Sequence, residues 1–357
     1  MSGSVETNSA RRSGTIGAKV AGPTISASDP TISTNATLGT QWANSTSGEF
    51  FICTDSTEGS NVWTNVGSGS GDIRPWAFQG TVSGYTYGGA SSSNVIDKVS
   101  FTSDGNATDV GDMTVARGNT AGGKSQTHGF VAGGYGSSAS NVIEKHAYAS
   151  DSDTSDVGDL TASRYSVSGQ SSETHGYVSA GWISVATNVI EKYSTSSDGN
   201  GSDVGDCTQA REYVTGCSSD SHGYVVGGSS PSSNVIEKFS FSSDGNGSDV
   251  GDISSSRNAN AGQSSTASGY SCGGYASSAQ NVIEKFSFSS DGNATDVGDL
   301  TVSRHGSSGP SSTSYGYVGG GHSNLNTIDK HNFSSDGNAT DVGDLTSGRH
   351  YLGNSQY

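Results

Sequence analysis

Short runs in which apolar and polar residues alternate recur along most of this chain. In the run from 281 to 288, an extended backbone places Val282, Phe286 and Phe288 on one face and Ile283 on the other. Apolar residues on both faces are typical of a sheet that packs between two neighbouring sheets. The run therefore predicts a β-strand that is buried on both sides.

The same run occurs six times at nearly even spacing. Its Asn-Val-Ile marker, written Asn-Thr-Ile in the last case, begins at Asn94, Asn141, Asn188, Asn234, Asn281 and Asn326, so the steps are 45 to 47 residues. A fixed period of this length is typical of stacked copies of one supersecondary unit. We refer to each occurrence as a copy.

Each copy predicts four short strands. The first follows an Arg, as at 165–172, and the second is a Gly-aromatic run, as at 223–228. The third is the Asn-Val-Ile run, and the fourth is Thr-Asp-Val-Gly-Asp-Leu, as at 295–300. An Asp-Gly-Asn turn joins the third and fourth strands in most copies, because these residues tolerate positive φ.

Four short strands in a period of this length resemble the Kelch repeat. The matching residues are the opening Arg of each copy and, in one copy, Tyr224, Val225, Gly227, Gly228, Val235, Glu237 and Phe239. Where Kelch repeats usually carry a Trp in the fourth strand, this chain has Val110, Val157, Val204, Val250, Val297 and Val342. The resemblance spans residues 74–357 and implies an all-β, six-bladed Kelch-like β-propeller.

The two ends of the repeat array complement one another. The first copy lacks the Arg at its usual offset, and the chain ends with Arg349 and eight residues that match the first strand of a further copy. We therefore expect residues 350–357 to add a strand to the first copy and close the ring.

Two segments precede the propeller domain of residues 72–357. Residues 1–36 predict an extended N-terminal arm, either a flexible tail or a segment that orders on a partner. Residues 37–71 predict a small β module and linker, with Trp42, Phe51 and Trp63 as its aromatic core. Three strands are near the minimum for stability, so the module is expected to need a partner.

Residues 38–42, 48–55 and 61–67 resemble a short N-terminal segment of virion proteins of tailed bacteriophages, especially phages of marine bacteria. The resemblance implies attachment to a particle, with other virion proteins bound through residues 1–71. The residues expected to anchor the chain are Arg11, Arg12, Lys19, Trp42 and Trp63.

Composition narrows the function classes. The apolar fraction of 30% would suggest disorder if the repeat did not argue against it. A net charge of −17 disfavours binding to nucleic acid. The chain contains no window of about 20 apolar residues, so membrane insertion is not expected. Met1 is not followed by a secretory signal, so assembly in a host cytoplasm is expected.

No catalytic residue, metal site or cofactor is predicted. The isolated Cys53, Cys207, Cys217 and Cys272 indicate free thiols. The Asp-rich turns carry oxygen ligands of the kind that Ca²⁺ takes, but the turn itself explains them. His128, His175 and His222 recur at one position in separate copies, which disfavours convergence on a metal. Asp112 and Arg117, with their counterparts in later copies, are expected to pair structurally.

Side chains that differ among the copies fall on the loops after Gly-Gly and after the Arg. There they are expected to contact a sugar or protein, or else to cover the blade ends. Trp182 is expected to be exposed. The candidates are Tyr135, Tyr165, Trp182, Ile183, Tyr213, Tyr275, His305, His322, Leu325 and Tyr351.

These expectations favour a non-enzymatic virion structural protein, tail- or fibre-associated, whose propeller contacts a host-surface glycan or protein or a neighbouring subunit. A homo-oligomer such as a trimer is expected. Three alternatives stay open: a capsid-decorating fibre protein, a carbohydrate-active or copper-dependent oxidative propeller enzyme, and an intracellular Kelch-type adaptor.

Overall fold

A computed structural model describes residues 22–67, 73, 75–90 and 93–357. The described residues form β-strands and no helix, as expected of an all-β protein. The chain divides into a small unit that ends at Trp76 and a large unit that begins at Ala77. The anchoring residues Arg11, Arg12 and Lys19 lie outside the described residues.

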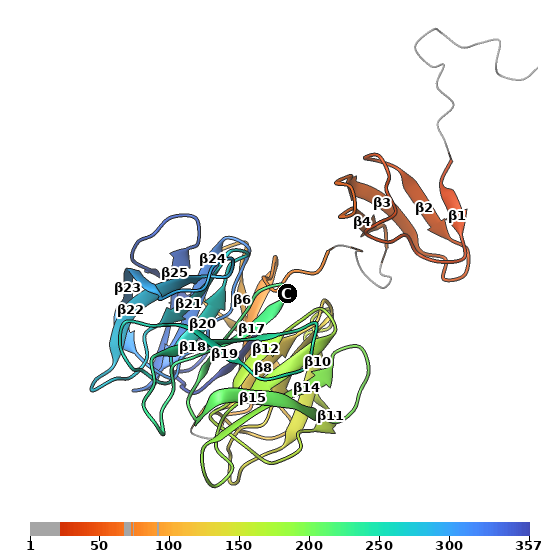
Figure 1. The fold of residues 1–357 in the computed structure, drawn as a ribbon. Coiled ribbons are helices and arrows are strands. Elements are labelled where there is room, and N and C mark those ends of the chain that lie inside the picture. The colour runs from red at the N-terminus through yellow and green to blue at the C-terminus, as the bar shows by residue number, and fades with distance from the viewer. Residues whose placement is uncertain (1–21, 68–72, 74, 91–92) are drawn as a thin grey trace, which may run out of the picture. The chain divides into compact units, whose positions relative to one another are not determined.

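The small unit is a four-stranded sheet (Figure 1). Its strands, in spatial order, are β1 (Thr24–Ser26), β2 (Gln41–Asn44), β3 (Phe50–Asp55) and β4 (Val62–Asn65). The first pair is parallel and the others are antiparallel. Residues 24–36 therefore belong to this unit and not to the expected arm. The polar sequence of β1 lacks the alternation that would predict a strand.

Phe51, Cys53 and Trp63 form the core of the small unit. Trp42 packs against them, with its ring centroid 5.9 Å from that of Trp63. Trp63 is fully buried, so it holds the unit together and does not reach a partner surface. Trp42 is half-buried and donates from Nε1 to the carbonyl of Ser28.

The large unit contains six sheets, which correspond to the six copies. The first sheet is β27 (Gly353–Gln356), β5 (Ser83–Tyr87), β6 (Val95–Ser100) and β7 (Thr108–Asp112). The second is β8 (Ala121–Lys124), β9 (His128–Ala132), β10 (Val142–Ala147) and β11 (Ser155–Asp159). The third is β12 (Ser168–Ser171), β13 (His175–Ser179), β14 (Thr187–Ser194) and β15 (Ser202–Arg211).

The other three sheets follow the same plan. The fourth is β16 (Thr215–Ser218), β17 (His222–Val226), β18 (Val235–Ser240) and β19 (Ser248–Asp252). The fifth is β20 (Ala261–Ser264), β21 (Ser268–Cys272), β22 (Gln280–Ser287) and β23 (Thr295–Arg304). The sixth is β24 (Tyr315–Gly321), β25 (Leu325–Asn332) and β26 (Thr340–Asp344), with isolated bridges from Ser308 and Ser311 in place of a first strand.

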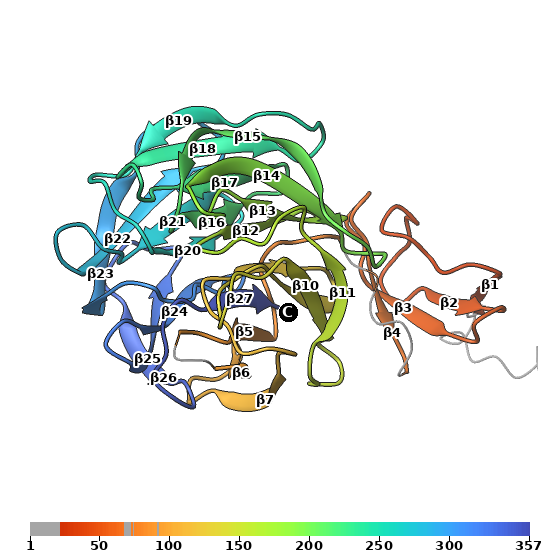
Figure 2. The ribbon, with the colours of Figure 1, turned by 90° about the horizontal axis from the view of Figure 1, so that it is seen from below.

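The first strands of successive sheets lie next to one another in a closed order. Contacts run from β27 to β8, β12, β16, β20 and the sixth sheet, and a parallel bridge between Gly80 and Ser312 joins the sixth sheet to the start of the unit. Figure 2 shows the sheets following one another around a common centre. The backbone approaches closely there: a Cβ on Gly169 would lie 1.9 Å from the carbonyl oxygen of Gly122, so only glycine fits.

The last strand joins the first copy, as the ends of the array predict. β27 pairs antiparallel with β5, with Gly353 opposite Tyr87 and Gln356 opposite Gly84. The carbonyl of Tyr357 also accepts backbone N–H groups from residues 81–83. The first sheet is thus built from both ends of the large unit.

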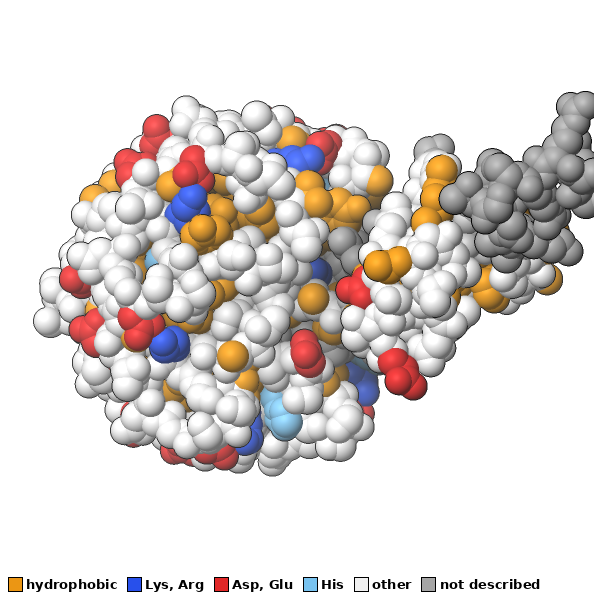
Figure 3. Space-filling view, turned by 90° about the horizontal axis from the view of Figure 1, so that it is seen from above, with side chains coloured by type: hydrophobic (Ala, Val, Ile, Leu, Met, Phe, Trp, Pro, Cys, Tyr) orange, Lys and Arg blue, Asp and Glu red, His pale blue; other side chains and the backbone are white. Residues whose placement is uncertain are grey.

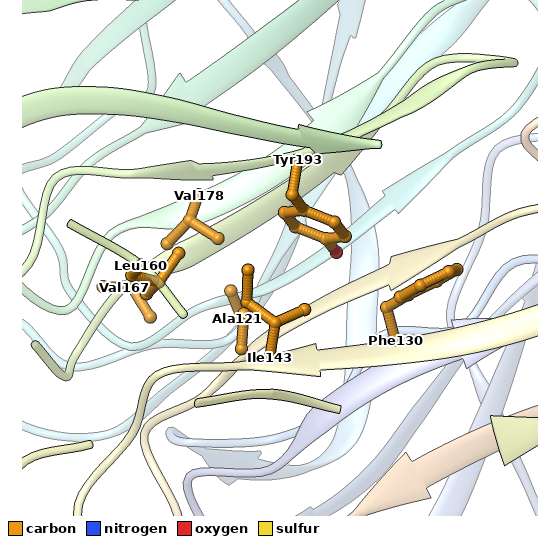
Figure 4. Close-up of a cluster of buried hydrophobic side chains, with 8 residues drawn as sticks. Ala121, Phe130, Ile143, Leu160, Val167, Val178 and Tyr193 are labelled. Carbon is orange, nitrogen blue, oxygen red and sulfur yellow. The ribbon is translucent and has the colours of Figure 1, made fainter. Parts of the chain in front are cut away.

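A separate hydrophobic cluster fills each interface between neighbouring sheets. Figure 4 shows the cluster in which Ile143 and Leu160 of one copy meet Val178 and Tyr193 of the next. As predicted, β22 is buried on both faces: Phe286 packs toward the fourth sheet, and Ile283 toward the sixth.

Candidate binding face at one end of the repeat unit

Six buried ion pairs position the loops at one end of the sheets. In each, the Arg at or after the end of the fourth strand of one sheet meets the acid in the third strand of the next sheet, and side-chain exposure is at most 4%. The pairs are Arg117–Glu144, Arg164–Glu191, Arg211–Glu237, Arg257–Glu284, Arg304–Asp329 and Arg349–Asp97. These constant pairs hold the residues that follow each Arg in one orientation.

The expected pairing of Arg117 with Asp112 is wrong. Arg117 Nη1 lies 2.6 Å from Glu144 Oε1, whereas Asp112 is an exposed residue at the end of β7. Burial alone would raise the pKa of Glu144, but Arg117 and the hydroxyl groups of Thr114 and Thr154 outweigh it and hold the pKa below its usual value. Glu144 therefore stays ionised inside the protein.

The Asp-Gly-Asn turns connect neighbouring copies. Lys192 Nζ lies 2.7 Å from Asp244 in the turn of the next copy, and the N–H of Asp206 donates to Asn246 in the same turn. Equivalent Lys–Asp pairs join all six copies, ending with Lys330 and Asp104. Within the described residues, no group of three or more His, Cys, Asp or Glu side chains could hold a metal ion.

A closed ring of backbone hydrogen bonds lies at the end of the sheets where the Arg loops emerge. The second residue after each Arg adopts a left-handed conformation, with φ between 53° and 68°. Each N–H donates to the carbonyl of its counterpart in the preceding copy, over 2.5 to 3.0 Å. The six residues are Asn119, Ser166, Tyr213, Ala259, Gly306 and Tyr351, and the N–H of Asn119 closes the ring on Tyr351. We call them the axial ring.

Two tyrosines meet across the axial ring. Tyr213 and Tyr351 occupy its third and sixth places, and their ring centroids are 5.3 Å apart. Beside them is a depression of about 60 Å³, lined by all six axial-ring residues and by Val167, Val214, Asn260, Ser307 and Leu352. The backbone hydrogen bonds repeat six times at this end, but the residues that carry them are of five different types, with Tyr occurring twice.

The ring of Tyr351 contacts the imidazole rings of His305 and His350. His305 stacks on His322 with centroids 4.6 Å apart, and His322 contacts His350 at 5.2 Å. Burial lowers the pKa of His305, and His322 and His350 lower it further. Burial and His322 likewise lower the pKa of His350. The two imidazoles are therefore neutral at pH 7.

The structure brings together most of the predicted loop residues. Tyr275 contacts His305, and Tyr135 contacts Tyr165, with centroids 5.1 and 5.0 Å apart. In four copies a backbone bridge joins the loop after the Arg to the loop after Gly-Gly, as between Tyr165 and Trp182.

Exposure of the remaining loop residues varies. Trp182 was expected to be exposed, but it is half-buried. A backbone bridge to Tyr165 holds it beside the loop that follows Arg164. Ile183 is exposed and Leu325 is half-buried. His128, His175 and His222 each lie beside the hydroxyl group of the preceding Thr or Ser.

Sequence reasoning missed Asn119, Ser166, Glu212 and His350. All four stand one or two residues after the Arg of a copy, where the copies differ most. Glu212 accepts a hydrogen bond from Ser230, and its charge contributes to raising the pKa of Tyr351, after burial and Tyr213. Aligning the copies on their Arg residues would have found these positions.

A second cavity, of about 80 Å³, lies among the first strands and reaches from Val214 and Leu352 to Phe78. The segment that contains Phe78 is held by hydrogen bonds from Lys124 to the carbonyl of Ala77 and from Gln356 to the carbonyl of Phe78. Lys124 is the one charged residue among those that line this cavity, so the cavity offers no acid–base pair.

Figure 3 shows acidic and basic side chains interspersed over the visible face of residues 77–357. All four cysteines are free, as predicted, and all four are buried. Among the described residues, there is no helix long and apolar enough to cross a membrane.

A search of known protein families and of curated proteins finds no match to this chain.

Proposed function

We propose that this chain is a non-enzymatic structural protein of a tailed bacteriophage particle, associated with its tail or fibres. In this proposal residues 77–357 form a six-bladed Kelch-like propeller, and the residues up to 76 attach it to other virion proteins. The end that carries the axial ring faces a host surface or a neighbouring subunit.

The observation that carries the proposal is the combination of a cyclic scaffold with side-chain variation at one end. Six sheets, six interface clusters and six axial hydrogen bonds support a propeller. The recurring Arg and Lys side chains are all engaged in ion pairs with acids of the scaffold, which supports binding and not turnover. Aromatic and imidazole groups gather where the copies differ, and such groups are common in recognition surfaces.

The small unit supports an attachment role. Ile25, Leu38 and Val66 are 73%, 66% and 57% exposed, and β1 is a short strand at the edge of its sheet. Exposed apolar side chains beside an open strand edge favour docking against another protein. The resemblance of residues 38–67 to N-terminal segments of virion proteins points in the same direction.

Purified particles of the phage whose genome encodes the chain test this function. Gel electrophoresis and mass spectrometry should find the protein in gradient-purified virions at a fixed ratio to a known structural protein. Immunogold labelling should place it on the tail or its fibres. Its presence in infected-cell lysate but not in virions would overturn the proposal, and labelling of the capsid would replace the tail location by capsid decoration.

A further inference from the structure

We propose that the depression at the axial ring binds a single uncharged sugar residue. This inference rests on the proposed function, because it names the ligand class of the same face. The depression is placed where side chains from all six copies meet, so one ligand would contact several copies at once. Tyr213 and Tyr351 form one side of it, and Asn119 and Ser166 occupy the ring places between them.

Charge limits the class of ligand. The residues that line the depression include no Asp, Glu, Lys, Arg or His. The nearby His305 and His350 are neutral at pH 7, because burial lowers the pKa of each. An anion would therefore meet no compensating charge, and desolvation would disfavour its binding. The lining favours a polar molecule without charge.

Unpaired polar atoms show that hydrogen bonds are available. Ser166 is 3% exposed, and its Oγ has no hydrogen-bond partner in the protein. Asn119 Oδ1 is also buried without a partner. Buried polar atoms are normally paired with protein or water, and leaving them unpaired costs stability. Hydroxyl groups of a ligand would supply the missing partners.

Aromatic surface complements these polar atoms. Tyr213 and Tyr351 are half-buried residues, and their ring planes are inclined by 43°. A pyranose ring presents apolar C–H groups on its faces and hydroxyl groups along its edges, so it can contact phenol rings and hydrogen-bond donors or acceptors together. A volume of about 60 Å³ admits several water-sized groups, which is enough for the edge of one sugar residue.

Saturation-transfer NMR on the full chain tests the inference. The probes are the methyl glycosides of glucose, galactose, mannose and N-acetylglucosamine, with inorganic phosphate and choline as charged comparisons. The test variants are Tyr213→Asn, Tyr351→Asn and Ser166→Gly. Asn and Gly tolerate the left-handed backbone at these positions, so the axial ring should be retained. Tyr315→Asn is the control, since this tyrosine is half-buried like Tyr213 but lies in β24, outside the depression and outside the candidate loops.

We expect at least one methyl glycoside to bind, and neither charged probe. The Tyr213 and Tyr351 variants should each weaken binding on the order of tenfold, Ser166→Gly should weaken it less, and Tyr315→Asn should leave it unchanged. Binding of none of the glycosides, preferential binding of phosphate or choline, or equal binding by the Tyr351→Asn variant would overturn the inference. Virion incorporation is measured separately, so a chain that is found in particles but binds no sugar would refute the ligand and leave the proposed function standing.

Discussion

Arg349 and Asp97 are 252 residues apart in the chain and form a buried ion pair, with Nη2 2.5 Å from Oδ2. Arg349 belongs to the end of the last copy, and Asp97 lies on the third strand of the first. The same pair occurs within the chain at five other junctions, so the closure repeats the internal geometry. The two ends of the large unit are therefore joined by the contacts that join any two copies.

Removal of residues 350–357 should destabilise the large unit by several kcal/mol. The deletion takes away β27 and leaves the edge of β5 unpaired, which also promotes association between chains. Urea unfolding followed by circular dichroism measures the loss. Replacement of Gly353–Gln356 by Ser-Gly-Gln-Ser, the sequence of β12, keeps a strand in place and should retain most of the stability. An unchanged midpoint after the deletion would contradict the closure.

Arg211→Met and Glu237→Leu should each reduce the free energy of unfolding by about 3–5 kcal/mol, because each leaves a buried charge without its partner. The double variant should lose less than the sum of the two. Chemical unfolding of all three variants gives the coupling energy.

The exposed Lys238–Asp291 pair provides the control for that cycle. Solvent screens this pair, so Lys238→Ala should cost less than about 1 kcal/mol. If the losses of unfolding free energy at Arg211 and Glu237 add exactly, or if Lys238→Ala costs as much as Arg211→Met, the buried pairs do not stabilise the protein through burial.

Acid should destabilise the large unit through its buried histidines. Burial lowers the pKa of His331 to about 4, below the value of about 6.5 in an unfolded chain. The unfolded state binds more protons between these values, so the contribution of His331 to stability is complete above pH 6.5 and declines as pH falls toward 4. The loss at pH 4 is about 3 kcal/mol for one such histidine.

His331→Phe should flatten this acid limb without loss at pH 7. Phe239 and Phe286 hold the equivalent position in other copies, and each rests on a glycine as His331 rests on Gly316. Unfolding measured from pH 4 to 8 tests the change, with the exposed His322→Phe as the comparison. A slope that is the same in the His331 variant and the unmodified chain would contradict the assignment.

The architecture of the copies could be predicted because its signals are local. Alternation located Ile283 and Phe286 on opposite faces of one strand, and the truncated copy at the end of the chain identified the closing strand. Period and turn residues were sufficient for both, since neither depends on which distant side chains meet.

The ion pairs and the axial ring could not be predicted in the same way. Arg117 precedes Glu144 by 27 residues, and Asp112 recurs beside Arg117 in the copies just as regularly, so the repeat alone does not indicate which acid the Arg meets. Tyr213 and Ala259 adopt a left-handed conformation that their residue types disfavour, so no local signal marks the ring. Likewise, the half-burial of Trp182 follows from a backbone bridge to Tyr165 that alternation does not reveal.

An engineered disulfide tests the cyclic arrangement most directly. Thr86 and Asn354 lie opposite one another in the β5–β27 pair, at a separation that suits a disulfide between paired strands. Peptide mass spectrometry after mild oxidation of the Thr86→Cys, Asn354→Cys variant should find the linked peptide within single chains in nearly all molecules. A Thr86→Cys, Gln170→Cys variant should not form such a link. Absence of the Thr86–Asn354 link, or links only between different chains, would contradict the closed ring of six sheets.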